Sequence, residues 1–173
     1  MRGLRALVLA TMAGLALGSD AFAIDPGSNG DPAFWNGFYL GILGGVGSDI
    51  ATSTSQFHNL GISAGAGATT NDGFYFGAEA FLAGESFNGG APYLWLEADG
   101  RVGIVVNDRV LFFGSGGVAY DTDAAAMALT GGGGAEFAVT DTLSVRGQYS
   151  VQYYPSGLGT FHQGIMGLFW RLE

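Results

Sequence analysis

The sequence has 173 residues, of which 48% are hydrophobic and 12% are charged, and it contains no cysteine and no lysine. The net charge of −9 excludes a nucleic-acid-binding role, because phosphate contacts need clustered basic side chains. Without cysteine, a disulfide framework and a thiolate metal site are excluded, and we expect no cofactor. An ordinary soluble domain has roughly 25% charged residues, so this composition is unusual for one.

The first 23 residues are typical of a signal peptide. Arg2 and Arg5 precede an apolar run over 6–18, and Ala21-Phe22-Ala23 is a small-x-small cleavage site. The run is shorter than the roughly 20 residues that a membrane-spanning helix needs. We expect cleavage near Ala23, which leaves a net charge of −10, and a short linker over 24–36.

Alternating segments follow in the rest of the chain. Between Leu94 and Val106 the even-numbered residues are uncharged, and the odd-numbered face carries Glu97, Asp99 and Arg101. A period of two indicates a β-strand, since successive side chains point to opposite faces. The same reasoning predicts eight strands, over 37–49, 58–70, 73–86, 93–106, 109–121, 126–139, 143–154 and 162–172.

The connections between these segments are of two kinds. Short polar breaks at 71–72, 107–108 and 140–142 favour tight turns, and longer connections lie at 50–57, 87–92, 122–125 and 155–161. Eight long strands with alternating turns and loops predict an all-β fold over 37–173, an eight-stranded antiparallel up-and-down transmembrane β-barrel.

Alternation by itself also fits a soluble barrel with its apolar face inward. The absence of lysine and the position of the charges favour the inverted arrangement. Glu97, Asp99 and Arg101 are interpreted as matched within one strand, and Glu136 lies opposite Arg146 if residues 139 and 143 pair. Buried charges persist when they are paired. The predicted interior polar network is Glu79, Glu97, Asp99, Arg101, Glu136 and Arg146.

Aromatic residues gather at the strand ends of the apolar face, where a transmembrane barrel has its interface girdles. The predicted membrane-interface aromatics are Phe38, Phe74, Phe76, Phe112, Phe137 and Trp170 near the short turns, and Tyr120, Tyr149 and Tyr153 toward the longer loops.

Several segments resemble the small outer-membrane surface barrels of Gram-negative bacteria, the opacity-protein-like and immunogenic "porin family" proteins related to the outer-membrane protein A barrel. The opening WNGFYLG at 35–41 is similar to the W-x-G-F-Y-x-G start of that family, and similar hairpin segments lie at 101–104, 107–109, 116–120, 132–138 and 143–146. The resemblance implies a location in the outer membrane, contact with its lipids and lipopolysaccharide, and assembly by the barrel-assembly machinery.

We expect a monomeric, non-enzymatic envelope protein with a surface-exposed, structural role. A narrow porin-like channel is the alternative, although eight strands leave an interior that side chains fill. A lipid A-modifying enzyme is the second alternative. It would use His58 or His162 at the loop rim, with Ser156 and Asp121 or Asp123 on the same side. We expect solvated side chains at Asp49, Glu85, Asp121 and Asp123, with a shared divalent cation as the less favoured interpretation.

Overall fold

The computed structural model describes residues 33–51, 55–106 and 108–172. The expected signal peptide and most of the expected linker lie outside the described residues. One short 3-10 helix, η2 (Ala33–Trp35), precedes eight strands: β1 (Gly37–Asp49), β2 (Gln56–Thr69), β3 (Phe74–Phe87), β4 (Tyr93–Val106), β5 (Val110–Asp121), β6 (Ala126–Ala138), β7 (Leu143–Tyr154) and β8 (Gly159–Arg171). Within the described ranges, no helix has the length and apolar character needed to cross a bilayer.

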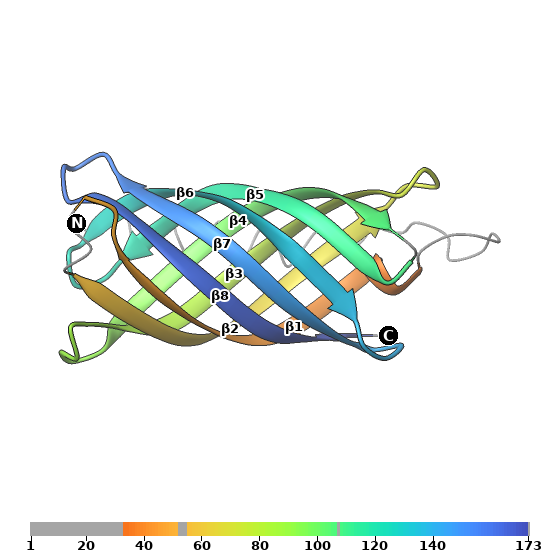
Figure 1. Ribbon diagram of the computed structural model, residues 1–173, viewed down its shortest axis with the longest axis horizontal. Helices are drawn as coiled ribbons and strands as arrows, with labels where there is room; N and C mark the ends of the chain where they lie inside the picture. The colour runs from red at the N-terminus through yellow and green to blue at the C-terminus, as the bar shows by residue number, and fades with distance from the viewer. Residues whose placement is uncertain (1–32, 52–54, 107, 173) are drawn as a thin grey trace, which may run out of the picture.

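The eight strands close into a barrel. Each strand pairs antiparallel with its neighbours in the sequence, and β1 pairs with β8 to complete the ring. Figure 1 shows the strands winding obliquely around the long axis. The predicted fold class and strand number are therefore confirmed, and the bounds of β1, β4 and β7 match the prediction.

The predicted contrast between short turns and long loops is smaller than expected. β8 begins at Gly159 rather than at His162, because residues 159–161 extend the ladder with β7. The connection 155–158 is then no longer than the turn 70–73. We call the end of the barrel with the connections β2–β3, β4–β5 and β6–β7 the short-turn rim, and the opposite end the long-loop rim.

Strand β4 shows which face is inside. Trp95 and Arg101 point into the barrel and are 0% and 3% exposed, whereas Leu94 and Val102 on the other face are 53% and 58% exposed. The charged face therefore lines the interior and the apolar face forms the outer wall. This is the reverse of a soluble barrel, and it is the arrangement that the alternation and charge pattern predict.

Glycines make room for large side chains inside the barrel. A Cβ atom built on Gly65 would collide with the ring of Tyr39, and one on Gly41 would collide with the ring of Phe169. The glycines that weaken the side-chain pattern of β2 thus have a packing role, because an interior of eight strands is too narrow for two large residues at one level.

Aromatic side chains cover both ends of the interior. At the short-turn rim, Trp35 of η2 is fully buried against Tyr75 and Phe113, and its Nε1 donates a hydrogen bond to the Asp108 carbonyl oxygen at 3.0 Å. Residues 33–35 of the expected linker thus close this end. At the long-loop rim, the rings of Phe57, Phe87 and Phe161 lie 5.3–6.3 Å apart, centroid to centroid.

Candidate functional site

Three of the four arginines outside the expected signal peptide point into the short-turn half of the barrel. They converge on two glutamates, and each of these five residues comes from a different strand. We call this group, Arg101, Arg146, Arg171, Glu79 and Glu136, the arginine cluster. Its bonds join strands that are not neighbours in the barrel, so it links opposite walls as well as adjacent strands.

Glu136 on β6 is fully buried and accepts four hydrogen bonds. Oε2 accepts from Arg146 Nε at 2.8 Å and from Arg101 Nη2 at 3.3 Å. Oε1 accepts from Arg171 Nη2 at 2.6 Å and from Ser144 Oγ at 2.6 Å. A buried carboxylate is tolerated when its oxygens are satisfied in this way, and removal of its partners would leave a costly unpaired charge.

Glu79 on β3 is the second acceptor. Arg146 Nη1 lies 2.8 Å from Oε1 and 2.7 Å from Oε2, and Arg101 Nη1 lies 3.3 Å from Oε2. The Tyr39 hydroxyl donates to Oε2 at 2.6 Å. Arg101 and Arg146 therefore each bond both glutamates, which couples the four side chains into one network.

Aromatic rings complete the surroundings of the guanidinium groups. The Arg146 guanidinium carbon lies 3.6 Å from the ring centroid of Phe169, and that of Arg101 lies 3.9 Å from the centroid of Phe113. Planar guanidinium groups stack well on ring faces, which supply attraction where no further carboxylate is available.

One pairing in this cluster is predicted from the sequence and one member is missed. Glu136 lies directly opposite Arg146 in the β6–β7 register, as the turn at 140–142 predicts. Arg171 does not belong to the predicted network. Its position on β8, one residue after the outward Trp170, is the signal that could have indicated an inward side chain.

The other predicted network residues, Glu97 and Asp99, lie nearer the long-loop rim and outside the arginine cluster. Trp95 Nε1 donates to Glu97 Oε2 at 2.9 Å, and Thr130 Oγ1 donates to Asp99 Oδ1 at 2.7 Å. Within the described ranges, the arginine ion pairs involve Glu79 and Glu136 but neither of these carboxyls. The interpretation that Arg101 matches them along one strand is wrong, because Arg101 extends across the interior to β3 and β6 instead.

We call the long-loop part of the interior the acidic half; its carboxyls are Glu85, Glu97, Asp99 and Asp121. Glu85 and Asp121 are 1% and 6% exposed, so the expectation that they are solvated rim acids is wrong. The Tyr93 hydroxyl donates to Glu85 Oε1 at 2.5 Å. Asp121 Oδ1 accepts from the backbone N–H groups of the loop that follows, at 2.8 and 2.9 Å.

A cation site among the rim acids finds no support in the part of the chain that the structure describes. Asp123 is exposed in the loop after β5, whereas Asp121 points inward. No group of three or more histidine or acidic side chains in the described ranges could hold a metal ion.

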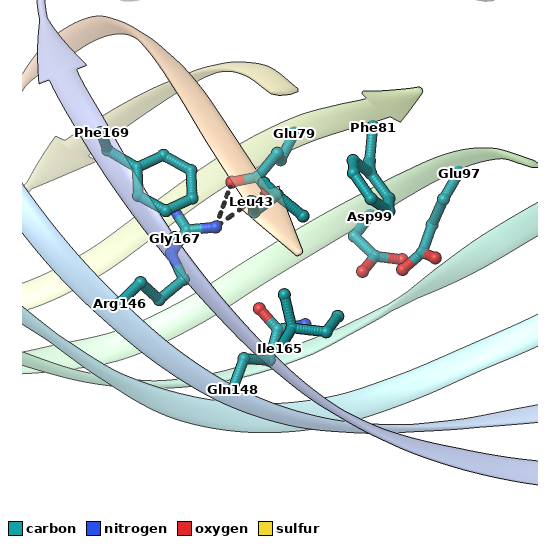
Figure 2. Close-up of a pocket in the computed structure, with 10 residues that line it drawn as sticks. All are labelled: Leu43, Glu79, Phe81, Glu97, Asp99, Arg146, Gln148, Ile165, Gly167 and Phe169. Atoms are coloured by element: carbon teal, nitrogen blue, oxygen red, sulfur yellow. Dashed lines mark hydrogen bonds and ion pairs between the residues drawn. The ribbon is translucent and has the colours of Figure 1, made fainter. Parts of the chain in front are cut away.

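A small cavity lies between the arginine cluster and the acidic half. Figure 2 shows its lining, with Arg146 bonded to Glu79 on one side and the carboxyl groups of Glu97 and Asp99 directed toward one another on the other side. Its volume is about 20 Å³, which is room for about one water molecule.

The predicted interface aromatics all project from the outer wall. Eight of them are 41–54% exposed, and Tyr120 is half-buried. Phe38, Phe74, Phe112 and Trp170 are among those at the short-turn rim, and Tyr153 ends β7 at the long-loop rim. Their placement at the two ends fits the predicted girdles, and their role at a membrane interface stays a prediction.

The two histidines lie on the outer wall near the long-loop rim. His58 on β2 is exposed. His162 on β8 lies opposite Ser48 of β1, and its Nε2 lies 3.0 Å from Ser48 Oγ. Sequence reasoning missed Ser48 and instead considered Ser156, which is exposed in the connection after β7.

No family model and no curated protein matches this sequence. Solved structures do match. Ail, the attachment invasion locus protein of Yersinia pestis, is 10% identical with a TM-score of 0.55, over 79% of this chain and 99% of that one. Neisserial surface protein A is 13% identical with a TM-score of 0.54, over 79% and 98%. The outer membrane enzyme PagL is 15% identical with a TM-score of 0.52, over 76% and 99%.

Identities this low carry information about the fold alone. The neighbours share the closed antiparallel barrel and are covered almost completely by this chain. The described chain therefore has the fold of the small eight-stranded barrels of bacterial outer membranes.

Proposed function

We propose that this protein is a monomeric barrel of the Gram-negative outer membrane, with a structural, surface-exposed role and an interior that conducts no ions. The observation that carries the proposal is an interior filled by ion pairs and covered by aromatic side chains at both ends, inside a wall that is apolar outside. Its partners are outer-membrane lipids, lipopolysaccharide and, during insertion, the barrel-assembly machinery.

The apolar outer wall supports the membrane location. Along β4, the side chains of Leu94, Val102 and Ile104 are 49–58% exposed, and the inward face holds the charges. In water such a wall would be an aggregation hazard, whereas in a bilayer it is the required surface.

The interior argues against the channel alternative. A cavity of about 20 Å³ lies between the arginine cluster and the acidic half. On the short-turn side of this cavity, the arginine cluster fills the cross-section of the barrel. We expect no discrete conductance in planar bilayers loaded with folded protein. Discrete current steps that disappear with heat-unfolded protein would overturn the sealed interior.

A depth-dependent substitution pair tests the membrane location. Ala98 lies mid-strand on the outer face of β4, and Val106 lies at its short-turn end. In lipid vesicles, Ala98→Arg should lower the free energy of unfolding by about 2–4 kcal/mol and Val106→Arg by about 0–1 kcal/mol. Equal costs at both depths would contradict a bilayer centred on the barrel, as would recovery of the protein from cells in the soluble fraction.

A further inference from the structure

A serine and a tyrosine hydrogen-bond the two ring nitrogens of one histidine on the outer wall beside the long-loop rim. Ser48 of β1 and His162 of β8 are register partners where the first and last strands close the barrel. Ser48 Oγ lies 3.0 Å from His162 Nε2, and the Tyr149 hydroxyl of β7 lies 3.2 Å from His162 Nδ1. Both ring nitrogens are thus engaged.

We propose that Ser48 and His162 form a hydrolytic site for the acyl ester of a membrane lipid, with Tyr149 as a positioning residue. A serine hydroxyl becomes a useful nucleophile when an adjacent base accepts its proton and a third group orients that base. With the proton on Nδ1 bonded to Tyr149, Nε2 is free to accept the hydrogen of Ser48. The distance of 3.0 Å is within the range for this transfer.

The surroundings of the three residues favour a lipid as the substrate. The site opens onto a groove of about 820 Å³ beside the rim, whose polar lining includes His58 and Asn88. From the site toward the middle of the barrel, the outer wall is apolar, with Val46 and Met166 each 69% exposed. A membrane lipid bound here would place its polar ester region in the groove at the rim. Its acyl chain would lie along the apolar outer wall.

Gly164 leaves free space on the outer wall beside His162, because it has no side chain. It lies between Val46 and Tyr149 in the registers of β8 with β1 and β7. A Cβ atom at this position would meet nothing within 4 Å, so the packing of the barrel itself does not require a glycine there. A side chain would instead occupy the space in which an acyl chain can approach His162.

The reaction is an acyl transfer followed by hydrolysis. Ser48 Oγ bonds to the ester carbonyl carbon while its proton moves to His162 Nε2. The bond from that carbon to the alcohol oxygen breaks, and His162 returns the proton to the leaving oxygen. A water molecule then attacks the acyl-Ser48 carbonyl carbon while its proton moves to His162 Nε2. The bond from that carbon to Ser48 Oγ breaks, His162 returns the proton to Oγ, and the fatty acid is released.

This inference goes beyond the proposed function and departs from the expectation of a barrel without catalytic activity. The site lies on the outer wall and shares no residue with the arginine cluster. The proposal of a sealed interior and the proposal of a hydrolytic site on the outer wall can therefore be disproved independently.

The test uses the chain without residues 1–23, folded in vesicles of phosphatidylethanolamine with lipopolysaccharide. A fluorophosphonate probe should label Ser48, located by peptide mass spectrometry, and mass spectrometry of the lipids should detect released fatty acid. The two lipids carry different acyl chains, so the released acid identifies its source. Ser48→Ala should abolish labelling and release, and His162→Asn should lower the release rate about 100-fold or more.

The Tyr149→Phe variant tests the positioning role. Because the hydroxyl bonds His162 Nδ1, its loss should lower kcat several-fold and leave KM unchanged. A change in KM alone, with kcat intact, would contradict the assigned role.

A second serine controls for general effects at the rim. Ser86 of β3 lies opposite His58 in the β2–β3 register, but it is buried and its Oγ donates to the Gly90 carbonyl oxygen at 2.7 Å. Ser86→Ala should leave labelling and release unchanged, with folding of every variant checked by its heat-dependent gel shift.

Three results would overturn the inference. The first is folded protein that takes no label. The second is a label on Ser48 without fatty acid release from either lipid. The third is equal loss of activity in the Ser86→Ala variant and the Ser48→Ala variant.

Discussion

In the part of the chain that the structure describes, the carboxylates of the short-turn half form ion pairs with arginines, whereas the carboxyls of the acidic half form none. Glu136 accepts hydrogen bonds from three arginines and a serine, with no exposed surface. Glu97, on the same inward surface, accepts from Trp95 Nε1. Two inward carboxyls of similar burial therefore have different partners: Glu136 holds three cations in place, whereas Glu97 bonds the indole of its own strand and faces the carboxyl group of Asp99.

The largest expected effect comes from neutralising the centre of the arginine cluster. Glu136→Gln keeps the shape of the side chain but leaves three buried guanidinium groups without their shared carboxylate. We expect the free energy of unfolding to fall by about 5 kcal/mol. Urea unfolding in lipid vesicles, followed by tryptophan fluorescence, measures this. A loss below that of the Glu97→Gln variant would reverse the comparison.

Removing one cation from the same cluster should cost less. Arg146→Ala leaves Glu79 and Glu136 with Arg101 and, for Glu136, also Arg171. We expect a loss of about 4 kcal/mol by the same unfolding measurement. Planar-bilayer recording of this variant should still show no discrete conductance, since the aromatic ends remain. Current steps in the variant and not in the wild-type protein would show that the arginine cluster, rather than the ends, closes the barrel.

The smallest effect is expected in the acidic half. Glu97→Gln keeps an oxygen that can accept from Trp95 Nε1 and replaces the carboxyl group beside Asp99 with an amide. We expect the free energy of unfolding to change by no more than about 1 kcal/mol. A loss as large as that of Glu136→Gln would mean that Glu97 has a cationic partner at neutral pH, and would end the distinction between the two halves.

The arginine cluster contains one ion pair between residues close in sequence and one between residues far apart in sequence. The Glu136–Arg146 pair spans ten residues around one turn, and its register follows from the turn itself. The pair between Arg146 and Glu79 spans 67 residues. It depends on how far β3 and β7 are offset around the closed barrel, which no local pattern specifies.

The Ser48–His162 pair is a stronger example of a contact that no local sequence pattern specifies. The two residues are 114 positions apart and meet only where β1 and β8 close the ring. Periodicity indicates that both lie on the outer face near strand ends. It does not indicate that they are direct partners, so Ser156 was as reasonable a candidate as Ser48.

The strands, their two faces and the eight-stranded barrel class follow from the sequence, because alternation with a period of two decides which side chains share an environment. From Leu94 to Val106 the face assignment is correct at each residue that is clearly buried or exposed. The three-dimensional structure was needed to find the partners across the barrel, the inward position of Arg171, and the burial of Glu85 and Asp121. These depend on the offset between closed strands and on how side chains of unequal length share a narrow interior, which are properties of the whole ring rather than of any segment.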